Sequence, residues 1–193
     1  MPRPQEFDTT EALRQALGVF WRKGYEATSV TDLLAATGLS KSSLYATFGG
    51  KRELFIAAFD TYRQDRARAA HHVLEQGAVR PAIDAFFHQL FASVNDAEPA
   101  YGCMSINQAV ELAPHDPEVR QRVVQDLQLM EDLLTRTIER GQQAGALTSP
   151  RPARDLAKLL VLAFPGLQVM ARAGYSPQQL DDSLQLLLSH LDG

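Results

Sequence analysis

The chain has 193 residues, 45% of them hydrophobic and 22% charged, which is an ordinary composition for a soluble globular protein. A single cysteine, Cys103, excludes an intrachain disulfide, and the longest apolar stretch, residues 159–167, is too short for a bilayer span of about 20 residues. The formal net charge of −4 argues, taken alone, against a nucleic-acid partner.

The charge is unevenly distributed along the chain. Residues 1–70 carry ten Lys and Arg against eight Asp and Glu, a net charge of +2, whereas the remaining residues carry a net charge of −6. The acidic excess therefore lies in the C-terminal two thirds, and a DNA-facing surface near the N-terminus remains possible. Because the first residues are polar and lack the apolar core of a signal peptide, we expect a cytoplasmic protein without membrane contact.

Nearly every segment has the apolar periodicity of a helix and no stretch alternates like a strand, so we expect an all-α fold. The first predicted helix is capped by Thr9 or Thr10 and ends before Gly24. Two short helices follow, one from Val30 to Gly38 and one after Ser40. Gly49-Gly50 then breaks the chain, and a longer helix begins at residue 51. The two short helices and the turn between them are therefore the first segment to consider for a binding function.

Longer helices are predicted in the rest of the chain. An aromatic face begins near residue 80, a short helix covers 103–112, and Asp116-Pro117-Glu118 has the cap, proline and acidic residue of a helix start. That helix is expected to reach Gly141 or Gly145. Two further helices cover 156–171 and 176–191, and Pro165-Gly166 is expected to kink the first of them.

The segment from residue 28 to residue 51 predicts a helix-turn-helix. Gly38 supplies the positive φ of a tight turn, Leu39 fills the angle between the two helices, and Ser40 caps the second helix. In a helix-turn-helix the second helix enters the major groove of DNA by its N-terminal residues. Its polar positions are suited to phosphates and base edges: Lys41, Ser42, Ser43, Tyr45 and Thr47.

The run from Gly38 to Tyr45, followed by Phe48 and by Lys51-Arg52-Glu53-Leu54-Phe55, resembles the DNA-binding domain of TetR-type repressors, and Gly24–Val30 is similar to that family as well. The resemblance implies a DNA-binding domain over 1–66 and an effector-binding and dimerisation domain over 67–193. It also implies that Tyr45 and Lys51 hold the phosphate backbone. The full set of expected DNA contacts is Thr28, Ser29, Thr31, Ser40, Lys41, Ser42, Ser43, Tyr45, Thr47 and Lys51.

The two C-terminal helices carry more apolar surface than a small core hides, which favours a symmetric dimer. TetR-type proteins pair their last two helices in a similar way. The expected interface consists of Leu160, Leu167, Leu180, Leu184, Leu187 and Leu188. The alternative is that both helices close a monomeric core.

An effector pocket for an unidentified small molecule is expected in the C-terminal part, with an apolar lining and a few polar groups. Its candidate residues are Phe87, Phe91, Cys103, Asn107, Glu111, Met130 and Phe164. The surroundings of Cys103 are similar to a subgroup of the family in which some members sense oxidants or electrophiles through a cysteine. Cys103 is therefore either such a sensor or a small buried side chain.

The predicted function is a signal-responsive DNA-binding regulator, most simply a repressor that binds a palindromic operator as a homodimer. The signal is either a small molecule or a modification of the thiol. A helical enzyme is disfavoured because the five histidines have no paired metal spacing, and we find no cofactor-binding loop or nucleophile motif. We therefore expect no cofactor and no metal. A protein-binding scaffold that has lost its DNA affinity remains a third reading.

Overall fold

The computed structural model describes residues 7–91 and 101–192, with the side chains of residues 90 and 91 left out. These residues form nine α-helices and no strand, so the predicted all-α fold is confirmed. The helices are α1 (Thr9–Lys23), α2 (Val30–Thr37), α3 (Lys41–Phe48), α4 (Lys51–Glu75), α5 (Val79–Phe91), α6 (Met104–Glu111), α7 (Pro117–Gln143), α8 (Ala153–Arg172) and α9 (Pro177–Leu188).

Side-chain caps fix where several helices begin. The carboxylate of Asp8 accepts hydrogen bonds from the amides of Thr10 (2.8 Å) and Glu11 (3.4 Å) at the start of α1. The expectation of Thr9 or Thr10 as the cap is therefore wrong, because both threonines already lie inside the helix. The predicted start of α7 is confirmed, since Asp116 caps it and proline occupies its first position.

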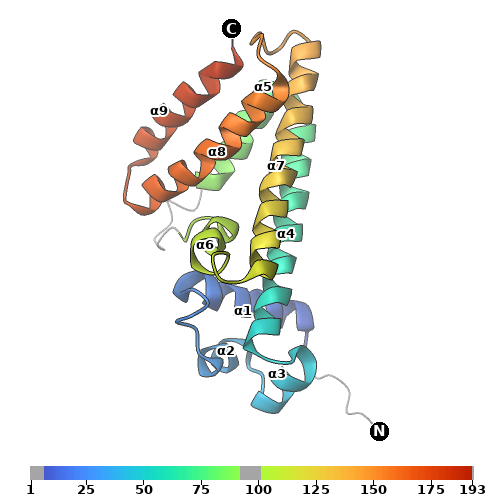
Figure 1. The fold of residues 1–193 in the computed structure, drawn as a ribbon, viewed down its shortest axis with the longest axis vertical. Coiled ribbons are helices and arrows are strands. Elements are labelled where there is room, and N and C mark those ends of the chain that lie inside the picture. The colour runs from blue at the N-terminus through green and yellow to red at the C-terminus, as the bar shows by residue number, and fades with distance from the viewer. Residues whose placement is uncertain (1–6, 92–100, 193) are drawn as a thin grey trace.

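Helices α1 to α3 and the first turns of α4 form a compact unit at one end of the molecule, here called the head (Figure 1). Its core contains Phe20, Leu33, Leu44 and Phe55, which are all at most 1% exposed. From the head, α4 runs the length of the molecule beside α7 (Figure 1). The expected domain boundary at residue 66 lies within this continuous helix, so the division of the chain there stays a prediction.

The head is also packed directly against the rest of the chain. Met104 of α6 and both Val119 and Val123 of α7 join the same apolar cluster as the head residues. A second apolar cluster holds α4, α5, α7, α8 and α9 together. Because α6 and α7 share a close-packed core with the head, a displacement of either helix changes the packing of the head.

The leucines expected at a dimer interface lie mostly inside the chain's own core. Five of them are at most 6% exposed: Leu160, Leu167, Leu180, Leu184 and Leu188. All of them except Leu180 belong to the second apolar cluster, and Leu187 is half-buried at its margin. The prediction is therefore corrected for Leu160, Leu180, Leu184 and Leu188, which the chain buries by itself. Leu167 and Leu187 line a groove between α8 and α9, so their part in an interface stays a prediction. The apolar side chains that α8 and α9 do expose are Leu159, Leu162, Val169 and Leu186.

Helix α8 is continuous from Ala153 to Arg172 and includes Pro165. Within the described residues, no helix is long and apolar enough to cross a membrane.

Candidate nucleic-acid interface and internal cavity

The turn between α2 and α3 has the geometry that its sequence predicts. Gly38 ends α2 with φ 67°, in the left-handed region. Leu39 is 7% exposed and packs in the head core, and the Oγ of Ser40 accepts a hydrogen bond from the Ser43 amide at 3.0 Å. Each turn residue therefore does what a helix-turn-helix requires of it, and α3 is held at a fixed angle to α2.

Helix α3 buries one residue and presents polar side chains to solvent. Leu44 is fully buried, while Tyr45 is 46% exposed. Three further side chains predicted to contact DNA are exposed, namely Lys41, Ser42 and Thr47, and Ser43 is half-buried. The short hydroxyl side chains leave the backbone of α3 close to the surface, which suits entry into a major groove.

The residues at the start of α2 differ in whether their side chains are exposed to a DNA partner. Ser29 and Thr31 are exposed, and Ser29 caps α2 by accepting a hydrogen bond from the Asp32 amide at 3.1 Å. Thr28 is 1% exposed, and its hydroxyl donates to the Gly24 carbonyl at 2.6 Å. The expected DNA contact of the Thr28 side chain is therefore corrected: this side chain fixes the loop after α1.

Lys51 lies at the first position of α4, and Gly50 leaves that helix without a side-chain cap. Its Nζ is 4.3 Å from the centroid of the Tyr25 ring and 3.5 Å from the Glu26 carbonyl oxygen. The ammonium group and the free amides of α4 are thus placed at the same end of the helix, where an anion would be stabilised by both. This is the arrangement expected of a phosphate site.

Three polar contacts tie the head to the helices behind it. Trp21 Nε1 donates to the Gly102 carbonyl at 3.0 Å, just before α6. At the other end of α6, Glu111 Oε1 accepts from the Glu26 amide at 3.0 Å. The third contact is the ion pair of Arg52 with Asp116 (2.9 Å) and Glu118 (2.7 Å) at the start of α7. Helix α6 therefore touches the head at both of its ends.

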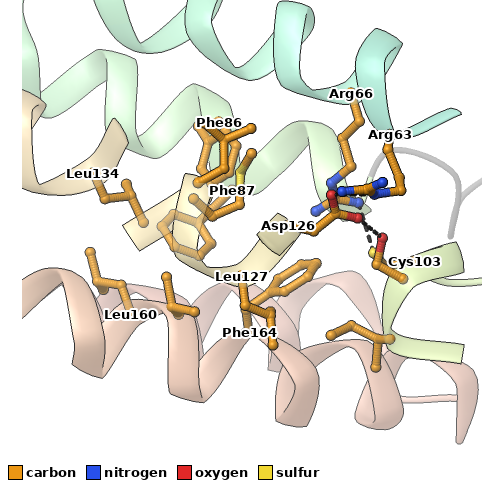
Figure 2. A pocket seen from close by; sticks show the side chains of 15 residues that line it. Arg63, Arg66, Phe86, Phe87, Cys103, Asp126, Leu127, Leu134, Leu160 and Phe164 are labelled. Carbon is orange, nitrogen blue, oxygen red and sulfur yellow. Dashed lines mark hydrogen bonds and ion pairs between the residues drawn. The ribbon is translucent and has the colours of Figure 1, made fainter. Parts of the chain in front are cut away.

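A cavity of about 30 Å³ lies among α4, α5, α6, α7 and α8 (Figure 2). Four of the residues predicted for an effector pocket line it: Phe87, Cys103, Met130 and Phe164. Two others do not. Asn107 instead bonds Tyr101 and Arg172, and Glu111 faces the head. The side chain of Phe91 lies outside the described residues.

Cys103 lies at the N-terminus of α6 and is 4% exposed. Its Sγ accepts a hydrogen bond from Arg66 Nη1 at 3.0 Å, and the Tyr62 hydroxyl lies 3.6 Å away. Burial, and then the sulfur of Cys103, raise the pKa of Tyr62 above its usual range. Burial alone would lower the pKa of Arg66, but the neighbouring Cys103 and Tyr62 outweigh it and raise the pKa.

Sequence reasoning missed Arg66 and Tyr62 because they lie far from Cys103 along the chain. The available signal was their spacing, since residues four apart share one face of the helix that begins at residue 51. Among the described residues, no group of His, Cys, Asp and Glu could hold a metal ion.

Comparison with known proteins agrees with this architecture. Residues 12–58 match the sequence profile of bacterial regulatory proteins of the tetR family, and residues 77–187 match that of tetracyclin repressor-like C-terminal domains. The chain belongs to the TetR family. Because the members of this family are transcriptional regulators, the chain is a helix-turn-helix regulator rather than an enzyme.

Several TetR-family relatives match over almost their whole length. The uncharacterized regulator YezE of Bacillus subtilis is 34% identical, with 100% of both chains covered. The Escherichia coli transcriptional repressor ComR is 32% identical over 92% of this chain and 86% of its own. Among solved structures, a cysteine mutant of the TetR-family regulator CifR in complex with a 26-bp operator is 28% identical. It has a TM-score of 0.84 and covers 96% of this chain and 98% of its own.

Proposed function

We propose that this regulator is a repressor that binds a palindromic operator as a homodimer and leaves it when a signal reaches the cavity beside Cys103. The observation that carries the proposal is the exposed polar face of α3, which a buried leucine and a capped turn hold in a fixed orientation. Support comes from the relative ComR, which is a repressor, and from a CifR mutant, whose structure was solved in complex with operator DNA.

In this proposal the head divides its DNA contacts between base edges and backbone. Lys41, Ser42 and Thr47 lie on the exposed face of α3 and face the major groove. Tyr45 and Lys51 flank that face and hold phosphates, Lys51 together with the amide groups of α4. The net positive charge of residues 1–70 favours this approach, although the whole chain is acidic.

The proposed dimer uses the outer face of α8 and α9 rather than the leucines of the core. Leu162 is 78% exposed, Leu186 72% and Val169 62%. Such exposure is unfavourable for three large apolar side chains on neighbouring helices. Between these two helices runs a shallow groove that includes Gly166 and Met170. A second copy related by a two-fold axis would cover both the side chains and the groove.

The signal is proposed to act through the elements that join the cavity to the head. Helix α4 contributes Arg66 to the cavity and Lys51 to the DNA surface, and α6 begins at Cys103 and touches the head at both ends. Either a small molecule in the cavity or a change at the Cys103 thiol would displace these elements. To release the operator tenfold, the signal must favour the non-binding form by about 1.4 kcal/mol.

The test is a gel shift with the DNA upstream of the protein's own gene, at low and high salt. The unmodified protein should bind this DNA at both salt concentrations and unrelated DNA only at low salt. Lys41→Ala should lose the preference for the upstream DNA. Arg136→Ala, which removes the same charge from an exposed position in the C-terminal half of α7, should keep it. Absence of binding even at low salt would contradict the proposal and favour a scaffold without DNA affinity.

A further inference from the structure

The walls of the cavity carry an unbalanced positive charge. Three charged side chains line it: Arg63, Arg66 and Asp126. Asp126 is fully engaged, because one carboxylate oxygen accepts from Arg63 Nε at 2.7 Å and the other from the Ser105 hydroxyl at 2.6 Å. Within residues 7–91 and 101–192, Arg66 forms no ion pair with a carboxylate. Arg63 is compensated by Asp126 and also by Asp60, at 2.8 Å, so the uncompensated cation of the lining is Arg66.

The partners of Arg66 do not neutralise its charge. Its Nη1 donates to the hydroxyl of Tyr62 at 3.1 Å and to the sulfur of Cys103 at 3.0 Å, and its guanidinium lies 5.2 Å from the centroid of the Phe164 ring. Arg66 is half-buried, and a cation that is partly removed from water is stabilised by a neighbouring anion. The position of Arg66 therefore favours the binding of a negatively charged group in the cavity.

A second feature adds positive potential at the same place. The eight-residue helix α6 begins beside Arg66, and its N-cap residue Cys103 makes no side-chain cap hydrogen bond. The first amide of the helix, that of Met104, donates to the Tyr62 hydroxyl at 3.2 Å. The N-terminal end of a helix carries a partial positive charge and presents free N–H groups. Both Cys103 and Ser105 at this helix end line the cavity. The guanidinium and the helix end thus converge on one wall (Figure 2).

The opposite walls are apolar. They are formed by Phe86 and Phe87 of α5, Met130 and Leu134 of α7, and Leu160 of α8 (Figure 2). A cavity that is cationic at one end and hydrocarbon elsewhere is complementary to an amphiphilic anion.

We propose that the cavity binds a small apolar monocarboxylic acid, with its carboxylate on Arg66 and its ring or short chain among Phe86, Phe87 and Met130. The inference deepens the proposed function, since this acid would be the signal that releases DNA. The free volume of about 30 Å³ requires neighbouring side chains to shift, which the flexible Met130 allows. It also favours an acid with one ring or a short chain over a long lipid.

The experiment is a calorimetric titration of the full chain, without DNA, with benzoate, hexanoate and their neutral amides. The acids should bind, and the amides should bind roughly tenfold more weakly or not at all, because a charge-assisted hydrogen bond is lost. Arg66→Met should abolish the preference for the acids and Arg66→Lys should retain part of it. Arg68→Met, the same change at an exposed position of α4, should bind the acids as the parent does. Cys103→Ser should also keep the preference.

Four results would overturn the inference: no binding of either acid at millimolar concentration, equal binding of acids and amides, unchanged acid binding by a folded Arg66→Met, or loss of binding in a folded Cys103→Ser. Circular dichroism identifies variants that do not fold. Operator affinity is measured separately on the same preparations without acid. A chain that binds benzoate through Arg66 but does not bind the operator would refute the proposed function alone. A chain that binds the operator but neither acid would refute this inference alone.

Discussion

Replacement of Leu162 by glutamate should separate the proposed dimer into monomers. Burial of a leucine side chain stabilises by about 1.5–3 kcal/mol, and Leu162 is 78% exposed in the single chain. Because a two-fold axis buries this residue twice, the substitution removes about 2–5 kcal/mol of association free energy. The dissociation constant should therefore rise roughly 30- to 4000-fold. Burial of two like charges would increase the effect further.

Sedimentation velocity at micromolar concentration measures this change, and circular dichroism reports whether the variant is still folded. The matched control is Val110→Glu on α6, which places the same charge at a position that is also 78% exposed but lies outside α8 and α9. The control should remain dimeric. Leu184→Glu is expected instead to unfold the chain, because Leu184 is fully buried in the core. A monomeric parent, or a dimeric Leu162→Glu, would refute the proposed interface.

Three further predictions concern DNA contact, acid stability and the thiol. Tyr45→Phe and Lys51→Ala should weaken binding to operator and non-operator DNA alike. For Lys51→Ala, the slope of the logarithm of the binding constant against the logarithm of the salt concentration should also fall in magnitude by about one. A loss of affinity confined to one base position of the operator would instead show that these residues recognise sequence. Burial would raise the pKa of Asp60, but its hydrogen bonds with Arg122 and then Arg63 outweigh burial and lower it. The stabilisation from this group is therefore complete above the pKa of an unfolded aspartate, about 3.9, and is lost as the pH falls further. In urea unfolding between pH 6 and pH 3, Arg122→Met should lose less stability than the parent, and an equal loss would contradict this reasoning. Any effect of mild peroxide on operator affinity should be the same for the parent and for Cys103→Ser, because the sulfur is buried and the chain has no second cysteine. A response of the parent alone would instead show that the thiol is the sensor.

The helix-turn-helix could be predicted because its chemistry is local. Gly38, Leu39 and Ser40 determine the turn within three residues, and the structure confirms each of their roles. The start of α7 is equally local, since a cap and a proline specify it. The predicted N-cap of α1, Thr9 or Thr10, lies only one or two residues from the actual cap Asp8.

The interface and the cavity could not be predicted in the same way, because both depend on which faces the chain covers by itself. Periodicity shows that α9 has an apolar stripe but not that Leu184 meets the chain's own core while Leu186 faces outward. The contact of Arg66 with Cys103 joins residues 37 positions apart, so only the packing of α4 against α6 reveals it. Asn107 was expected in the pocket, yet its actual partner is Arg172 of α8.

The central claim is that two copies of the head read a symmetric DNA site. Selection from a library of random DNA duplexes, followed by sequencing of the bound fraction, tests this claim most directly. The account predicts enrichment of a palindrome whose half-sites are separated as two heads of one dimer require, and loss of that enrichment in Lys41→Ala. Enrichment of a single unsymmetric half-site, or of no sequence at all, would contradict it.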